Sequence, residues 1–416
     1  MKRYVLWCYY LVKATVLEFG KNHSTPHNNI IVFGSSLLGD FIMSLPALKL
    51  IRKCYPSYRI ILLTRASPSM QQLNSDSNQE KSALTIPWLE LAQPHLVDDA
   101  IVMEYSHPSS LLRDIRPLIQ QLNPKYCFLL TFQAVSIFGL WKKIVLLKFL
   151  GVSCSVWGAR RRRPLLSMKQ SQYNEGFYRH HVVGRVRSVL QSPIVAELKN
   201  IDFEFDLKIP LSALAVATNL WNQHGFNTKT VIAIAPGSIK EHKQWPIENF
   251  QKVCEYLLTK EQHQILVIGM PGHHFLGEEL TKMSPERVLN LAGAHSISVI
   301  AAILQRCALL IGNDGGAIHL GDSVGCRVVS IVSGIEYPFS VEPWHNVHHA
   351  VRHQVQCAPC YDFRKCPKSH NRCMKDLPVN EVLRKIDQVM NLSETDYTEL
   401  SLSQQQILKK TLSGES

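Results

Sequence analysis

The feature that most constrains the fold is a repeated alternation of short β-branched runs with stretches of helical spacing. Residues 29–33 read Asn-Ile-Ile-Val-Phe, a helical stretch runs from Asp40 to Lys53, and residues 59–63 form the next apolar run. A further run at 126–130 precedes a helical stretch at 137–150. Strands that alternate with helices build parallel βαβ units, so the sequence predicts an α/β fold.

The same alternation restarts after Ile209-Pro210. The expected strands are 231–235, 264–268, 308–311 and 327–332, and the expected helices are 246–258, 296–305 and 317–324. Two such halves predict two Rossmann-like domains, with parallel sheets facing a central cleft. Ligands of such sheets bind beyond the carboxyl ends of the strands, which directs attention to four loops, 34–40, 236–245, 269–275 and 312–319.

We expect five segments along the chain. They are an N-terminal amphipathic segment (1–28), an N-terminal Rossmann-like acceptor domain (29–210), a C-terminal Rossmann-like nucleotide-sugar domain (211–350), a Cys-rich loop (351–378), and a C-terminal helix with a polar tail (379–416).

The chain is basic, with 45 Lys and Arg against 33 Asp and Glu and a net charge of +12. This excess favours an anionic partner such as a nucleic acid, a phosphorylated glycan or an acidic membrane surface. The apolar run near the N-terminus is broken by Lys13, is too short to span a bilayer, and lacks an obvious cleavage site. It is either a helix packed on the body or an amphipathic helix at an anionic membrane surface, which Lys2, Arg3 and Lys13 favour.

Two of the four loops carry candidate catalytic or phosphate-binding groups. Asp40 ends the Gly-Ser-Ser-Leu-Leu-Gly-Asp loop after the first strand, where it is either a helix N-cap or a general base facing the cleft. In the 236–245 loop, Gly237 and Ser238 offer hydrogen-bond donors, and Lys240 or Lys243 could neutralise a phosphate. The alternative for this second loop is a solvated turn with two surface lysines.

The 312–319 loop reads Gly-Asn-Asp-Gly-Gly-Ala-Ile-His. Helix-start amides at Gly315 and Gly316 suit a diphosphate, and Asp314 could accept hydrogen bonds from sugar hydroxyls. His319 lies about one turn into the helix. The alternative is that Asp314 is an N-cap and His319 a core residue. None of the loops matches a Walker or GxGxxG signature.

Three segments together resemble glycosyltransferase family 9, the lipopolysaccharide heptosyltransferases. They are IIVFGSSLLGDFIMSLPALKLIRKCYP, IAIAPGSIKEHKQWPIENF and the stretch from LNLAGAHS to GNDGGAIHLGDS. A basic stretch followed by His180, His181, Val182 and Val183 is a fourth likeness, and the resemblance covers roughly residues 29–390. It implies the GT-B fold, with the donor in the C-terminal domain and the acceptor in the N-terminal one.

The resemblance also implies a reaction, an inverting transfer from ADP-heptose to a lipopolysaccharide core acceptor. Asp40 matches the catalytic aspartate that deprotonates the acceptor, and Lys243 matches the lysine that stabilises the donor phosphates. The other donor positions implied are Ser238, Asp314, Gly315, Gly316 and His319. Lys243 and backbone amides would meet the charge of the leaving ADP, so no divalent metal is expected to be essential.

The resemblance leaves several points open. Gly315 replaces the threonine of the family's GNDTG pattern, and no acidic residue follows the turn at 269–274, so donor identity is less constrained than reaction class. The alternatives are a protein acceptor, another nucleotide sugar, or a catalytically idle nucleotide-sugar binding protein. We expect a cytoplasmic protein, peripheral on the inner membrane, with no nucleic acid partner.

Two further clusters are candidate sites. The basic run Arg160, Arg161, Arg162 and Arg163, with Lys142, Lys143 and Lys148 nearby in sequence, is expected to line the acceptor side, the alternative being a solvated charge run. Cys357, Cys360, Cys366 and Cys373 form a compact C-x2-C-x5-C-x6-C cluster. Four thiolates suit a structural zinc or iron, while disulfides or unmetallated thiols are the alternatives.

Overall fold

The computed structural model describes most of the chain. The described residues are 27–66, 86–103, 111–130, 137–154, 156–157, 180–190, 192, 203–397 and 399. Within them lie two five-stranded sheets in which every pairing between named strands is parallel. The α/β prediction is therefore confirmed.

The N-terminal half is built on a sheet with the strand order β3-β2-β1-β4-β5. Its strands are β1 (His27–Phe33), β2 (Arg59–Arg65), β3 (Asp99–Met103), β4 (Pro124–Leu129) and β5 (Val156–Trp157). Its helices are α2 (Leu38–Ile42), α3 (Leu45–Cys54), α6 (Arg116–Leu122), α7 (Ile137–Phe149) and α8 (His181–Leu190). The apolar β1 run is buried because helices cover both faces of a parallel sheet.

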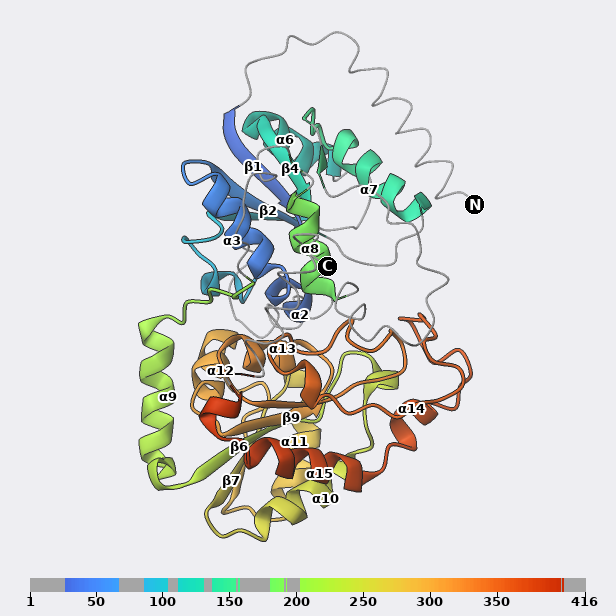
Figure 1. Ribbon diagram of the computed structural model, residues 1–416. Helices are drawn as coiled ribbons and strands as arrows, with labels where there is room; N and C mark the ends of the chain where they lie inside the picture. The colour runs from blue at the N-terminus through green and yellow to red at the C-terminus, as the bar shows by residue number, and fades with distance from the viewer. Residues whose placement is uncertain are drawn as a thin grey trace.

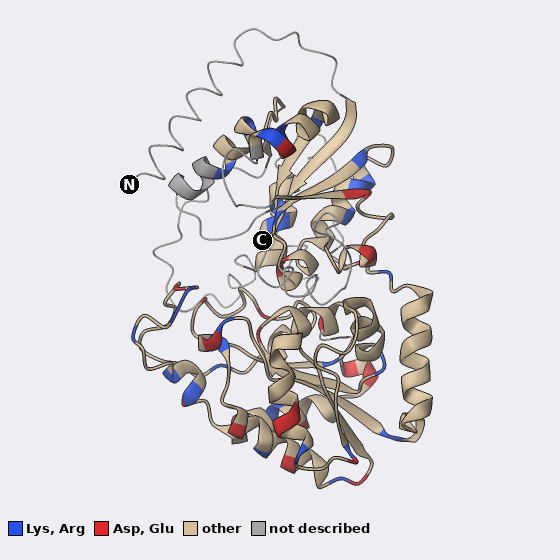
Figure 2. Ribbon diagram, turned by 180° about the vertical axis from the view of Figure 1, so that it is seen from behind, with Lys and Arg blue, Asp and Glu red and all other residues tan. Residues whose placement is uncertain are grey.

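The C-terminal half repeats this plan in the order β8-β7-β6-β9-β10. Its strands are β6 (Thr230–Ala235), β7 (His263–Val267), β8 (Val288–Asn290), β9 (Leu309–Asn313) and β10 (Val328–Ile331). Its helices are α9 (Leu211–Gln223), α10 (Ile247–Leu258), α11 (His274–Thr281), α12 (Ile297–Leu304), α13 (Gly316–Ser323), α14 (Arg372–Lys375) and α15 (Val379–Met390). Helix α9 bears no Lys, Arg, Asp or Glu (Figure 2).

The two halves pack directly against each other through α2 and α13 (Figure 1). The approach is close: a Cβ added to Gly39 would lie 2.8 Å from His319 Cδ2, and one added to Gly316 would lie 3.0 Å from Leu38 Cβ. One hydrophobic cluster includes buried residues from both halves, such as Phe41 and Ile318. A side chain at 39 would force the His319 ring to shift, and one at 316 would crowd Leu38, so both glycines favour this close approach.

In both sheets the order in which successive strands are added reverses at the centre. This switch point lies between β1 and β4 in the first sheet and between β6 and β9 in the second. At these points Phe33 lies beside Leu129, and Ala235 lies beside Gly312. Crevices at such switch points are where open α/β sheets bind ligands. The loops after β1, β6 and β9 are the three that carry the candidate residues.

Candidate active site

Asp40 lies inside α2, just beyond the carboxyl end of β1. The N-cap residue of α2 is Leu37, so the N-cap interpretation of Asp40 is wrong. Arg185 Nη2 donates to Asp40 Oδ1 at 2.6 Å, and Ser35 Oγ donates to Asp40 Oδ2 at 3.0 Å. The Asp40 side chain keeps 25% of its surface exposed. It is a fixed, partly accessible carboxylate, as a general base would need.

The charge on Asp40 is maintained by its neighbours. Burial raises the pKa of Asp40, but the Arg185 guanidinium and then His181 outweigh burial and hold that pKa below its ordinary value. Arg185 is 1% exposed and also donates from Nη1 to the His181 carbonyl at 3.1 Å. The carboxylate is therefore ionised and cannot rotate away without breaking a buried ion pair.

Helix α8, which carries Arg185, is anchored to the other half of the molecule. His181 Nε2 lies 2.9 Å from Glu336 Oε2, with both side chains largely buried. The His181 backbone N–H donates to the Ser340 carbonyl at 3.0 Å, and His180 Nε2 lies 2.8 Å from the Glu342 carbonyl. The residue that orients Asp40 is thus positioned by the C-terminal half. Residue types alone did not assign this role to Arg185, His181 or Glu336.

Lys243 and Asp314 form the second ion pair of the site. Lys243 Nζ lies 2.5 Å from Asp314 Oδ2, and their side chains are 15% and 6% exposed. His319 Nε2 lies 3.7 Å from Asp314 Oδ1. Burial raises the pKa of Asp314, but Lys243 and His319 hold it well below its ordinary value. The N-cap residue of α13 is Gly315, so the N-cap interpretation of Asp314 is wrong.

Asn313 joins the 236–245 and 312–319 loops and was not singled out from the sequence. Its Nδ2 donates to the Pro236 carbonyl at 2.6 Å, and its Oδ1 accepts from the Trp245 backbone N–H at 3.0 Å. The 236–245 loop is closed further by Gln244 Nε2, which donates to the Ser238 carbonyl at 2.7 Å. These bonds hold the 236–245 loop against the end of β9, where Lys243 pairs with Asp314 just before α13.

The loop after β7 adds a histidine to this region. Burial lowers the pKa of His273, and a hydrogen bond with the Ser238 backbone opposes part of this effect. A Cβ added to Gly237 would lie 2.2 Å from His273 Nδ1, so the ring packs directly on the glycine backbone. The 269–275 loop therefore contacts the 236–245 loop, and the 34–40 loop contacts the 312–319 segment. Each of the four loops expected at the cleft contacts another of them.

The basic residues expected on the acceptor side differ in whether the structure describes them and in what they contact. Arg160, Arg161, Arg162 and Arg163 lie outside the described residues, as does the side chain of Lys142. Lys148 Nζ donates to the Ser153 and Cys154 carbonyls at 3.1 and 2.9 Å. Lys143 is the one that lies near Asp40: burial lowers its pKa, and the charge of Asp40 opposes that effect. Only Lys143 of these described lysines therefore has a place beside the candidate base.

The Cys-rich loop lies next to the 236–245 loop. The Cys360 N–H donates to the Gly334 carbonyl at 3.2 Å, and Lys240 Nζ lies 4.8 Å from the centre of the Phe363 ring. Cys357 Sγ is 3.8 Å from His370 Nε2. Burial raises the pKa of Cys366, but the backbone amides of residues 368–371 lower it below its ordinary value. Across the described residues, no group of three or more His, Cys, Asp or Glu is arranged to hold a metal ion.

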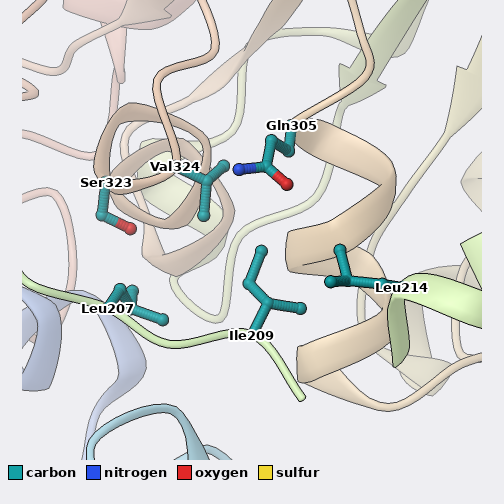
Figure 3. A pocket seen from close by; sticks show the side chains of 6 residues that line it. All are labelled: Leu207, Ile209, Leu214, Gln305, Ser323 and Val324. Carbon is teal, nitrogen blue, oxygen red and sulfur yellow. The ribbon is translucent and has the colours of Figure 1, made fainter. Parts of the chain in front are cut away.

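A separate pocket lies at the connection between the halves (Figure 3). Leu207, Ile209, Leu214, Gln305, Ser323 and Val324 line it. Ser323 ends α13, whose first residue is Gly316, so the pocket and the ion pairs lie at opposite ends of that helix. None of the candidate catalytic or donor residues lines the pocket.

The N-terminal segment 1–28 is described only from His27 onward. In the described part of the chain, no helix combines the length and the apolar composition that a membrane span requires.

Comparison with known proteins gives one family. The model of glycosyltransferase family 9 (heptosyltransferase) matches residues 116–370, more than half of the chain. A lipooligosaccharide heptosyltransferase 2 of Campylobacter jejuni is 29% identical over 166 residues, which cover 38% of this chain and 51% of that protein. The chain thus spans about half the length of the curated relatives it matches.

Solved structures share the fold. An ADP-heptose lipopolysaccharide heptosyltransferase II of E. coli superposes with a TM-score of 0.58 at 16% identity, covering 87% of this chain and 98% of that one. A family 9 glycosyltransferase of Veillonella parvula gives a TM-score of 0.58 at 17% identity, with 88% and 98% covered. At these identities the likeness establishes the GT-B architecture.

Proposed function

Because the chain belongs to glycosyltransferase family 9, we propose that it transfers a heptose from ADP-heptose to a lipopolysaccharide core acceptor, with inversion at the anomeric carbon. The observation that carries this proposal is the apposition of two ion pairs across the α2–α13 contact. Arg185–Asp40 comes from the N-terminal half, and Lys243–Asp314 comes from the C-terminal half.

In the proposed reaction, Asp40 accepts the proton of an acceptor hydroxyl. The hydroxyl oxygen forms a bond to the anomeric carbon while the bond from that carbon to the phosphate oxygen breaks. The electron pair leaves with ADP. Arg185 keeps Asp40 ionised and oriented, so the base is ready before the acceptor arrives.

The leaving diphosphate carries the negative charge that develops in this step. Lys243 and the backbone amides at the start of α13 would stabilise it, with Ser238 as a further donor. Asp314 and His319 would bind the donor from the same helix end. Because these groups supply the positive charge, we expect transfer to continue in the presence of EDTA.

The direct test incubates the protein with ADP-heptose and a heptose-deficient lipopolysaccharide core. Mass spectrometry should detect the addition of one heptose, and NMR should give an inverted anomeric configuration. Parallel reactions with other nucleotide sugars and with protein acceptors identify a different substrate. Donor binding without transfer to any acceptor would contradict the proposal and favour an idle binding protein.

We propose that this activity takes place at an anionic membrane surface on the cytoplasmic side of the inner membrane. The net charge of +12 and the basic N-terminal segment support this location. Arg160–Arg163 would bind the anionic acceptor. Cosedimentation with anionic vesicles should fall with salt and with removal of residues 1–26, and equal binding to neutral vesicles would contradict it.

We also propose a structural zinc or iron in the Cys-rich loop. Cys357, Cys360, Cys366 and Cys373 would supply four soft ligands, and the backbone amides directed at Cys366 favour its thiolate. In the structure these thiols are not arranged around one point, so binding the metal would draw them together. Four thiolates leave no position open for substrate, so the metal would brace the loop. Elemental analysis of reduced protein should find about one metal per chain, and its absence would end this proposal.

A further inference from the structure

Lys240 is a second cation in the loop that carries Lys243. It precedes Lys243 by three residues, and the Lys243 backbone N–H donates to the Lys240 carbonyl at 2.8 Å. Lys243 already has a carboxylate partner in Asp314 at 2.5 Å. Among the described residues, Lys240 has no carboxylate oxygen within ion-pair distance, so its charge is available to a ligand.

The charges around Lys240 locate its ammonium group. It interacts electrostatically with Lys243, Asp314, Asp40 and Glu336, which belong to both ion pairs and to the anchor of α8. Burial lowers the pKa of Lys240, and the charge of Lys243 lowers it further. Asp314 and Asp40 oppose this effect. The ammonium group is therefore within electrostatic range of both the candidate base and the Lys243–Asp314 ion pair.

The Cys-rich loop holds Lys240 there. Lys240 Nζ lies 4.8 Å from the centre of the Phe363 ring, within the range of a cation–π contact. The base of this loop is bonded to the 334–336 segment, where the Cys360 and Tyr361 N–H groups donate to the Gly334 and Ile335 carbonyls. Phe363 is thus tied to the segment that carries Glu336, the partner of His181.

We propose that Lys240 binds the sugar-linked phosphate of the nucleotide donor and that Phe363 of the Cys-rich loop positions it. This inference rests on the proposed function for the donor class. A residue near both Asp40 and Asp314 lies closer to the phosphate that leaves the sugar than to the phosphate that carries the nucleoside. The Cys-rich loop then forms one wall of the donor site.

The test measures Kd for ADP and AMP by calorimetry in Lys240→Met, Phe363→Leu and the double variant. Lys240→Met should weaken ADP about 10- to 100-fold, because it removes one charge-assisted phosphate contact, and AMP by less than about threefold. Phe363→Leu should weaken ADP about 3- to 10-fold. The double variant should match Lys240→Met, because Phe363 acts through Lys240.

Two variants serve as controls. Lys240→Arg keeps the charge and should retain most of the ADP affinity, whereas Lys252→Met removes an exposed charge on α10 and should leave Kd unchanged. Unchanged ADP binding in Lys240→Met, equal losses for ADP and AMP, or additive effects in the double variant would overturn the inference. If heptose transfer fails but ADP binding still depends on Lys240, the proposed reaction is wrong and this inference stands.

Discussion

Asp40 and Asp314 both lie beyond central strands at the switch points of their sheets, but their surroundings differ. Asp40 is 25% exposed and is held by a guanidinium from a helix of its own half. Asp314 is 6% exposed and is enclosed by Lys243 and His319. A carboxylate that is fixed but open suits proton transfer, and a carboxylate that is enclosed by Lys243 and His319 suits the organisation of a binding site.

The largest effect is expected at the open carboxylate. Asp40→Asn keeps the shape but removes the proton acceptor, so turnover should fall by about 10²- to 10⁴-fold. The Kd for ADP should change little, because Asp40 is not among the proposed phosphate contacts. Steady-state heptose transfer and calorimetry measure the two quantities. Near-parent turnover in folded Asp40→Asn would remove Asp40 from the chemistry.

At the enclosed carboxylate, the expected effect is on stability. Asp314→Asn leaves Lys243 buried without its partner and should lower the free energy of unfolding by about 3 to 5 kcal/mol. The double variant Asp314→Asn with Lys243→Met should be more stable than Asp314→Asn alone, because it removes the unpaired charge. Urea denaturation compares the two. Equal stability of Asp314→Asn and the parent would show that the pair does not hold the loops together.

The pH dependence of Asp314 follows from its lowered pKa. A carboxyl group whose pKa is depressed in the folded state contributes stability above its unfolded pKa of 3.8, and this contribution is lost as the pH falls. The parent should therefore lose stability below about pH 4 more steeply than the Asp314→Asn/Lys243→Met double variant. Parallel pH dependences in the two proteins would be inconsistent with the ion pair.

Arg185 tests whether the open carboxylate depends on its guanidinium. In Arg185→Met, burial would act on Asp40 with only His181 and the Ser35 hydrogen bond to oppose it, so the pKa of Asp40 should rise. The acidic limb of the kcat/KM profile should move to higher pH by about one unit or more, and Arg185→Lys should restore part of the shift. An unmoved limb would mean that another group titrates there.

The smallest effect is expected at Asp322, near the other end of α13. This third aspartate pairs with His345 and has no proposed role in the reaction. Burial lowers the pKa of His345, but Asp322 and Glu204 raise it to about 10. Its stabilising contribution is complete below the unfolded pKa of 6.5 and is lost as pH rises towards 10. Tm should fall by about 2 to 4 °C over that range in the parent and less in His345→Gln. An equal decline in both would contradict the assignment.

The sequence predicted most strands and helices from their periodic apolar patterns, but it did not predict β3, α6, α8, α9 or α11. Residues 40–53 were expected to form one helix, but the chain forms α2 and α3, since Pro46 in the first turn of α3 has no N–H to continue a helix from α2. Pro246, expected in the first turn, is instead the N-cap residue of α10. The strands β5 and β8 are too short for a periodic apolar pattern to be visible in the sequence.

The site was only partly predictable for a physical reason. Lys243 and Asp314 were identified from loop chemistry, but their pairing across 71 positions is a property of the folded chain. Arg185 lies on a helix with apolar neighbours, and an arginine in such a pattern is usually exposed. Its burial against Asp40 depends on α8 packing between the halves, which no local pattern encodes.

The most direct test of the difference between the two aspartates is single-turnover heptose transfer as a function of ADP-heptose concentration. The account predicts that Asp40→Asn stays slow at saturating donor, because its defect is in proton transfer. Asp314→Asn should approach the parent rate as donor increases, because its defect is in donor binding. Recovery of Asp40→Asn at high donor, or failure of Asp314→Asn to recover, would contradict the account.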